Sequence, residues 1–229
     1  MSKTVVLWTG GKDSMLALEE AWEWVGPVDM LATFVPRRGS FRAHPLPWMR
    51  LQARLLGIEH RTLPVDPPYR EGYEMALVQL RRMGISTIIT GDIAPVEGRE
   101  NWIRAQAKAA GLHAVLPLWG RARDEIFAAL DRRQIHAVIS YVRDPTLGPT
   151  WVGRRLDHRV CGALLQRQGT TGSDACGEQG EYHTMVVDAP RFRTPLTLPS
   201  GPPVFDGAGW HLPWCDAMPE GTTPADRQG

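Results

Sequence analysis

The chain has 229 residues, enough to bury a core in one large α/β domain or in a domain with a smaller partner. Its net charge of +1 disfavours nucleic acid as the main partner, because dedicated nucleic-acid binders are usually more basic. Three widely spaced cysteines without a Cys-x-x-Cys pair argue against a zinc or redox module, and the lack of a signal segment or long apolar run argues against a membrane, so we expect a cytoplasmic protein.

Short apolar runs alternate with amphipathic stretches through the first half of the chain. The pattern predicts strand 4–8, helix 14–24, strand 28–35, helix 47–56, strand 59–65, helix 69–83, strand 87–90 and helix 100–110. Such alternation is typical of βαβ units and predicts an α/β, Rossmann-like parallel sheet with helices on both faces. Ligands bind at the carboxyl ends of such strands, where the loops after Trp8 and Thr90 fall.

The second half has a different pattern of apolar and polar residues, which predicts a smaller α+β domain. Its expected elements are helix 124–132, strand 137–142, a loop at 145–149, helix 156–168, a Gly-rich polar stretch at 169–181 and strand 182–187. We therefore divide the chain into a first domain over 1–118, a smaller domain over 119–214 and a disordered tail over 215–229.

The sharpest motif lies between the first strand and the first helix. We call it the phosphate loop, and it consists of Thr9, Gly10, Gly11, Lys12, Asp13 and Ser14. The glycines allow a sharp bend and close approach to a ligand, while the helix N-terminus offers N–H groups and a positive dipole end. Thr9 and Ser14 add hydroxyl donors, and Lys12 adds a positive charge. The sequence therefore predicts phosphate binding here.

Asp13 is the unusual member of this loop, because a carboxylate beside phosphate is repulsive unless it caps the helix or holds Mg²⁺. The motif does not match a Walker A loop, which needs Ser or Thr directly after Lys12, and it does not match G-x-G-x-x-G. A Gly-Gly turn with a capping residue is the structural alternative.

Two further stretches carry polar groups. Gly91 and Asp92 follow a predicted strand, where Gly91 would let a nucleotide approach and Asp92 could contact it or a metal; a plain turn with a capping acid is the alternative. The second stretch, which we call the acidic loop, spans 174–184 and includes Cys176, Gly177, Glu178, Gly180, Glu181, Tyr182, His183 and Thr184. Its two Glu side chains could hold a metal or an ammonium or act as a base, and His183 could act as acid or base.

The phosphate loop resembles the S-G-G-K-D-S signature of the ATP-pyrophosphatase superfamily, with Thr9 in place of the usual Ser. The order of motifs along the chain resembles the diphthine–ammonia ligase family, bacterial relatives included. These motifs are Gly-Gly-Lys-Asp-Ser, Gly-Asp-Ile, Gly-Leu with Pro-Leu-Trp, Gly-Arg with Asp157, and Cys-Gly-Glu-x-Gly-Glu-Tyr-His-Thr. The resemblance covers about Val5 to Pro195 and implies a HUP-type fold for the nucleotide-binding part.

This resemblance implies an enzyme that adenylates a carboxylate with ATP and then lets ammonia displace AMP. Phosphates would bind at Gly10 to Ser14, with Lys12 neutralising the leaving pyrophosphate and Asp13 assisting with Mg²⁺. Gly91 and Asp92 would line the nucleotide pocket. The substrate-binding and catalytic groups would come from the acidic loop, with Glu178, Glu181 and His183 as its catalytic members.

The acceptor that the resemblance implies is diphthine on elongation factor 2. Arg greatly outnumbers Lys, a composition typical of GC-rich genomes, bacterial ones included, and a bacterial relative would need another acceptor such as a small carboxylic acid. Two other functions stay open: a tRNA-modifying enzyme, which would need a basic face, and an adenine-nucleotide sensor without turnover, which leaves the acidic loop unexplained. A homodimer is also left open.

Overall fold

The computed structural model describes residues 2–37, 43–67, 69–95, 101–143, 147–198 and 201–213, so the expected tail at 215–229 lies outside the described residues. The chain divides into two compact units. The first comprises Met1–Thr9, Asp13–Phe41 and Gly57–Ala122, and the second comprises Gly10–Lys12, Arg42–Leu56 and Arg123–Gly229. Each unit is therefore discontinuous in sequence.

The first unit is built on a five-stranded parallel sheet with the strand order β3-β2-β1-β4-β5. Its elements are β1 (Lys3–Leu7), α1 (Lys12–Val25, with Lys12 in the second unit), β2 (Met30–Pro36), β3 (Glu59–Val65), α3 (Tyr69–Arg82), β4 (Ile85–Ile89), α4 (Trp102–Ala109) and β5 (His113–Val115). This arrangement confirms the expected Rossmann-like α/β fold.

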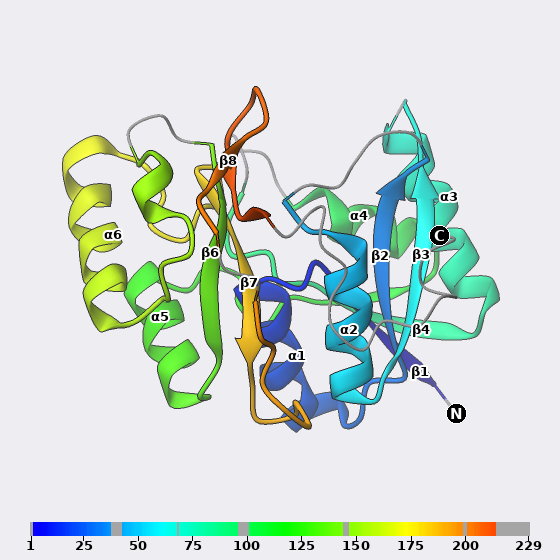
Figure 1. Cartoon of the computed structure of the whole chain (residues 1–229). Helices are drawn as coiled ribbons and strands as arrows, with labels where there is room; N and C mark the ends of the chain where they lie inside the picture. Colours follow the sequence, from blue (N-terminus) through cyan, green and yellow to red (C-terminus); the bar gives the residue numbers. More distant parts are fainter. Residues whose placement is uncertain are drawn as a thin grey trace. The chain divides into compact units, whose positions relative to one another are not determined.

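The strand order reverses at β1, which has β2 on one side and β4 on the other. Because crossovers between parallel strands are right-handed, the α1 crossover and the α4 crossover place their helices on opposite faces of the sheet. α3 and α4 pack against each other and against β3, β4 and β5 (Figure 1). The loops after β1 and β4 therefore leave the same edge of the sheet from neighbouring strands, as the sequence predicted.

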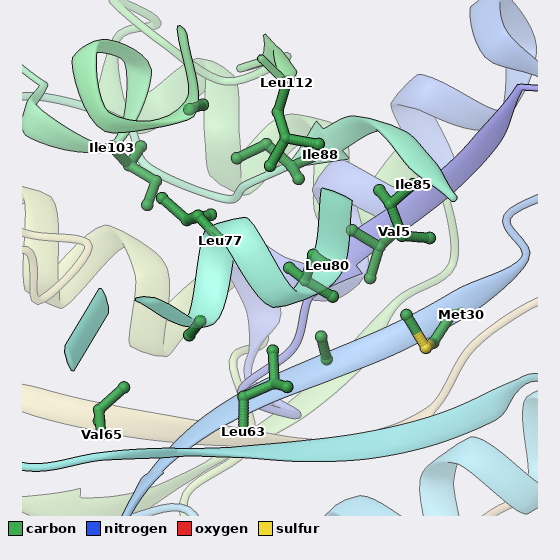
Figure 2. Close-up of a cluster of buried hydrophobic side chains, with 13 residues drawn as sticks. Val5, Met30, Leu63, Val65, Leu77, Leu80, Ile85, Ile88, Ile103 and Leu112 are labelled. Carbon is green, nitrogen blue, oxygen red and sulfur yellow. The ribbon is translucent and has the colours of Figure 1, made fainter. Parts of the chain in front are cut away.

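A cluster of buried apolar side chains lies between this sheet and the α3–α4 layer (Figure 2). Leu77 and Leu80 from α3 are fully buried and meet strand residues such as Val5 and Leu63. Each such leucine contributes about 1.5–3 kcal/mol through burial. The helical spacing of apolar residues in α3 thus fixes this helix on the sheet.

The second unit contains a four-stranded antiparallel sheet with the order β7-β6-β9-β8. Its elements are α2 (Leu46–Leu56), α5 (Arg123–Arg132), β6 (His136–Val142), the 3-10 helix η2 (Pro149–Trp151), α6 (His158–Thr171), β7 (Tyr182–Asp188), β8 (Val204–Phe205) and β9 (Trp210–His211). Helices together with this small antiparallel sheet confirm the expected α+β part.

The start of α6 differs from the expected helix at 156–168. Asp157 stays extended as the N-cap, and its side chain accepts hydrogen bonds from the backbone N–H groups of Arg159 and Val160. The bond from Val160 is the main reason why the pKa of Asp157 lies below its usual value. The helix then ends at Gly172, which adopts a left-handed conformation.

Candidate functional site

The predicted site residues fall in both units. In the first unit, Thr9 donates from its hydroxyl to the Ser14 hydroxyl at 3.2 Å. Gly91 lies against the start of α1, since a Cβ on it would come within 2.6 Å of the Asp13 carbonyl carbon. The close approach that Gly91 permits is thus an approach of backbone to backbone, and any side chain at 91 would displace the first turn of α1.

Asp92, the other predicted residue after β4, is tied to the cap of α4. Its Oδ2 accepts a hydrogen bond from Asn101 Nδ2 at 2.6 Å, and Asn101 Oδ1 accepts from Arg104 N at the start of the helix. The neighbouring positions 96–100 lie outside the described residues, including Glu97, Arg99 and Glu100.

In the second unit, Gly10–Lys12 lies along strand β7. The backbone N–H of Val186 donates to the Gly10 carbonyl at 3.0 Å, and the N–H of Lys12 donates to the Thr184 hydroxyl at 3.0 Å. Gly10 adopts a φ of 74°, which favours glycine. The centre of the phosphate loop is therefore fixed to the strand that follows the acidic loop.

Lys12 is the most deeply buried charged residue in this arrangement, with 2% of its surface exposed. Its Nζ donates to the carbonyl of Cys176 at 2.6 Å and lies 5.8 Å from the centre of the Tyr182 ring. Tyr182 is itself held in place, because its hydroxyl donates to the Ala175 carbonyl at 2.6 Å. The structure thus brings Lys12 together with three predicted members of the acidic loop: Cys176, Tyr182 and Thr184.

Glu181 organises the acidic loop from within. One carboxylate oxygen accepts from the N–H of Asp174 at 2.6 Å and the other from the N–H of Gln179 at 3.0 Å. Asp174 in turn forms a bidentate ion pair with Arg123, whose Nε donates to Oδ1 and whose Nη2 donates to Oδ2. Burial alone would raise the pKa of Asp174, but the bonds from Arg123 and the backbone hold that pKa below its usual value.

His183 lies on β7 among aromatic rings. Its ring centre is 4.9 Å from that of His44 and 5.8 Å from that of Tyr141, which pairs with it across the sheet. Burial, followed by the positive charges of Lys12 and Arg143, lowers the pKa of His183 from 6.5 to about 4. The imidazole is therefore neutral near pH 7, and the same surroundings make it a weak base there.

Two family models match this chain. The diphthamide synthase N-terminal domain matches residues 2–114, and the diphthamide synthase C-terminal domain matches residues 125–212. The chain belongs to the diphthamide synthase family. Membership supports an ATP-using enzyme of the ATP-pyrophosphatase type, the class that the phosphate loop resembles.

Among solved structures, the chain is similar to a protein from Methanocaldococcus jannaschii described as a predicted subunit of tRNA methyltransferase. The two share 14% sequence identity with a TM-score of 0.44, over 82% of this chain and 98% of the other. No curated protein matches the chain. Within the described residues, no helix is both long and apolar enough to cross a membrane.

The described residues include no group of three or more His, Cys, Asp or Glu side chains that could hold a metal ion. Mg²⁺ in ATP-using enzymes is commonly held by one or two carboxylates together with the substrate phosphates, so it needs no preformed cage. Asp13, in the first turn of α1, fits the part of a single carboxylate ligand for an ion that arrives with ATP.

The sequence did not point to several residues that shape this site. Gln52 of α2 bonds to Gly10, Arg123 pairs with the acidic loop, and Tyr141 and His44 surround His183. Gln52 carries one signal that could have been noticed, because it is an amide among the apolar residues that α2 buries. The others become neighbours of the loop only through the pairing of β6 with β7 and the packing of elements within the second unit.

Proposed function

We propose that the chain is an ATP-dependent carboxylate–ammonia ligase of the diphthine–ammonia ligase type. An oxygen of the acceptor carboxylate attacks the α-phosphorus of ATP, and the bond from that phosphorus to pyrophosphate breaks. Ammonia then attacks the acyl carbon of the adenylate, AMP leaves with the bonding electrons, and nitrogen loses a proton. The products are an amide, AMP and pyrophosphate.

One observation carries this proposal: Lys12 is bonded to the acidic loop at two points. Its N–H reaches Thr184 and its ammonium reaches the Cys176 carbonyl, both in the same unit. Lys12, which is suited to stabilise a leaving pyrophosphate, thus lies beside a loop that contains several acid–base groups. Adenylation followed by amidation needs both kinds of group. A nucleotide sensor has no use for that second group of residues.

The loop residues then take separate roles. His183, neutral near pH 7 and a weak base there, would take up only transiently the proton that the attacking nitrogen loses and pass it on. Glu178 would bind the incoming ammonium or ammonia. Glu181 would serve catalysis by holding the loop in shape, because both of its oxygens already accept backbone hydrogen bonds. Cys176, which is buried, would present its carbonyl to Lys12 rather than act as a nucleophile.

The nucleotide would be held by the phosphate loop, with Asp13 as a carboxylate ligand to Mg²⁺ and with Gly91 and Asp92 near the nucleotide. Bound Mg²⁺ would neutralise charge on the phosphates. The acceptor would be either diphthine on elongation factor 2 or a small carboxylic acid, with ammonia as the nitrogen donor. The protein would act in the cytoplasm.

The test is ATP turnover with Mg²⁺ and ammonium across a panel of carboxylates, including a diphthine-bearing elongation factor 2. AMP and pyrophosphate are quantified for wild type, Lys12→Ala and the matched control Lys108→Ala, which changes an exposed lysine of α4. We expect AMP, pyrophosphate and amide with one acceptor, at least a hundredfold loss in Lys12→Ala as is typical when a transition-state electrostatic group is removed, and wild-type rates in the control.

Other product patterns would contradict the proposal. ADP and phosphate would rule out adenylation. Turnover that requires tRNA and weakens steeply with salt would indicate a tRNA-modifying enzyme. Tight ATP binding without products for any acceptor would indicate a nucleotide sensor.

A further inference from the structure

Trp102, the first residue of α4, has 46% of its surface exposed. Its neighbour Ile103 is 3% exposed and points into the buried cluster of Figure 2. A single exposed tryptophan is common on protein surfaces and indicates nothing by itself. Its position on the sheet and its partners therefore decide what Trp102 can bind.

Trp102 belongs to a row of three rings from the first unit, which we call the aromatic row and which consists of Phe34, Tyr73 and Trp102. The centre of the indole lies 4.9 Å from that of Tyr73 on α3, and the Tyr73 ring meets Phe34 of β2 edge to face at 5.0 Å. Tilted and edge-to-face contacts at such distances are favourable and fix how the rings lie. Tyr73 thus holds Trp102 from one side, while nearly half of the Trp102 surface is open to solvent.

The aromatic row lies at the carboxyl edge of the parallel sheet. Phe34 is near the end of β2, Tyr73 is in the second turn of the helix that follows β3, and Trp102 begins the helix that follows β4. Open α/β sheets bind their ligands at this edge. The row therefore ends in a partly open indole at the place where the fold accommodates ligands.

A series of contacts within the first unit connects Trp102 to the start of α1, where the sequence predicts phosphate binding. Gly91 lies so close to Asp13 that a Cβ on Gly91 would stand 2.6 Å from the Asp13 carbonyl carbon. The next residue, Asp92, bonds to Asn101, which is the N-cap of α4 and directly precedes Trp102. A nucleotide whose phosphates bind at the start of α1 can therefore extend along these residues with its base toward Trp102.

We propose that Trp102 binds the adenine ring of ATP by stacking its indole against the base, and that Tyr73 holds the indole for this purpose. The inference rests on the proposed use of ATP and names the residue that binds the base. Adenine and indole are both flat π systems, and such a stack strengthens binding without any hydrogen bond. Trp102 takes no part in bond making or breaking, so its effect is confined to ligands that carry the base.

The experiment compares full-length wild type with Trp102→Ala, Trp102→Phe and the control Trp24→Ala. Trp24 is 61% exposed near the end of α1, and that helix end precedes the start of β2, so Trp24 lies at the opposite edge of the sheet. Calorimetry gives Kd values for a non-hydrolysable ATP analogue, for AMP and for inorganic pyrophosphate, which has no base. Urea titration reports folding.

We expect Trp102→Ala to bind the ATP analogue and AMP more weakly by the same factor, about five- to a hundredfold, as for the loss of one base–aromatic stack. The Kd for pyrophosphate should not change. Trp102→Phe keeps a π face and should recover most of the loss, and Trp24→Ala should match wild type with all three ligands. Lys12→Ala should show the complementary pattern, in which pyrophosphate binding is lost and AMP binding suffers least.

Several results would overturn the inference, and they separate it from the proposed function. Unchanged Kd values for the ATP analogue and AMP in Trp102→Ala would show that the indole does not bind the base and would leave the aromatic row to contact with another protein. An equal loss for all three ligands would show a general structural role. Wild type that binds pyrophosphate but not AMP would refute the adenine site alone, whereas wild type that binds none of the three would remove the proposed function as well.

A second variant covers the case in which Trp102→Ala does not fold. Trp102→Leu keeps apolar bulk against Tyr73 but lacks the π face, so it should fold and show the same selective loss for the ATP analogue and AMP. Loss of folding in both variants would assign Trp102 to packing alone.

Discussion

The ion pair between Arg123 and Asp174 holds the first residue of the acidic loop to the start of α5. Their side chains are only 15% and 13% exposed, and the Arg123 Nη2 to Asp174 Oδ2 distance is 2.5 Å. Asp174→Asn would leave the guanidinium partly buried beside a neutral amide, and we expect it to lower the free energy of unfolding by about 2 kcal/mol at pH 7. Urea denaturation of a double-mutant cycle with Arg123→Gln measures the coupling.

This contribution depends on pH in a defined direction. Because the folded-state pKa of Asp174 lies below 3.8, the pair stabilises the protein fully above that value and its contribution is lost as the pH falls below it. The stability difference between wild type and Asp174→Asn should therefore shrink at acidic pH. A difference that stays constant from pH 7 to pH 3 would contradict this assignment.

His183 predicts a loss of stability on acidification at a higher pH than Asp174 does. In the unfolded chain its imidazole takes up a proton near pH 6.5, whereas in the folded protein it stays neutral down to about pH 4. Stability should therefore fall as the pH is lowered from 6.5 to 4, by an amount on the order of 2 kcal/mol. Urea midpoints at pH 7, 5.5 and 4.5 should fall less steeply in His183→Gln than in wild type, while exposed His113→Gln on β5 should follow wild type.

The acidic loop also depends on one glycine for its shape. Gly177 has a φ of 81°, and a Cβ there would stand 2.7 Å from the carbonyl oxygen of Tyr182, whose ring lies beneath Lys12. Gly177→Ala should therefore combine backbone strain with a clash and lower the free energy of unfolding by about 2–4 kcal/mol. Gly180→Ala is the matched control, because Gly180 has a φ of 85° and its nearest atom to such a Cβ is 4.0 Å away.

Urea unfolding and ATP affinity of the two alanine variants separate strain from clash. Both should lose the stability that a left-handed alanine loses, about 1–2 kcal/mol, and only Gly177→Ala should lose more and bind ATP more weakly. Equal effects in the two variants would show that contact with Tyr182 is unimportant for the loop.

At the scale of elements, the sequence predicted what periodicity can encode. The strand at 59–65 and the helices α3 and α5 follow the expected bounds closely, because apolar spacing and a following Gly or turn mark them. Three short strands, β5, β8 and β9, have two or three residues each and carry no readable period. They form only because a neighbouring strand offers hydrogen bonds, a condition that no local pattern reports.

The site was predictable to a similar degree. Motifs marked Lys12 and the acidic loop, since unusual residue types are concentrated there. Their neighbours were not predictable, because Gln52 lies 134 positions before Val186 in sequence and Arg123 lies 51 before Asp174. Contacts across such separations depend on which strands pair, and the spacing of residues within a motif does not predict strand pairing.

At the scale of the whole molecule, the division into domains can be tested with fragments of the chain. The predicted boundary at residues 118 and 119 remains a proposal, as does the role of each segment. The second compact unit includes Gly10–Lys12 and α2 from the first half of the chain. Within that unit Gln52 and Gly10 bond to β7, and the carbonyl of Leu55 accepts from the N–H of Arg193. A fragment that begins at residue 119 lacks all of these partners.

We therefore predict that residues 119–229, expressed alone, do not fold cooperatively. Loss of α2 removes Met49 and Gln52 from the unit, and a buried methionine alone contributes about 1.5–3 kcal/mol, a large share of the 5–15 kcal/mol that stabilises a typical domain. Circular dichroism with urea titration should show a broad transition for this fragment and a single sharp one for the full chain. Mixing it with residues 1–118 should restore the sharp transition and ATP binding together, because the phosphate loop and β7 then meet again. A fragment 119–229 that unfolds sharply by itself would show instead that its own strands and helices suffice for folding.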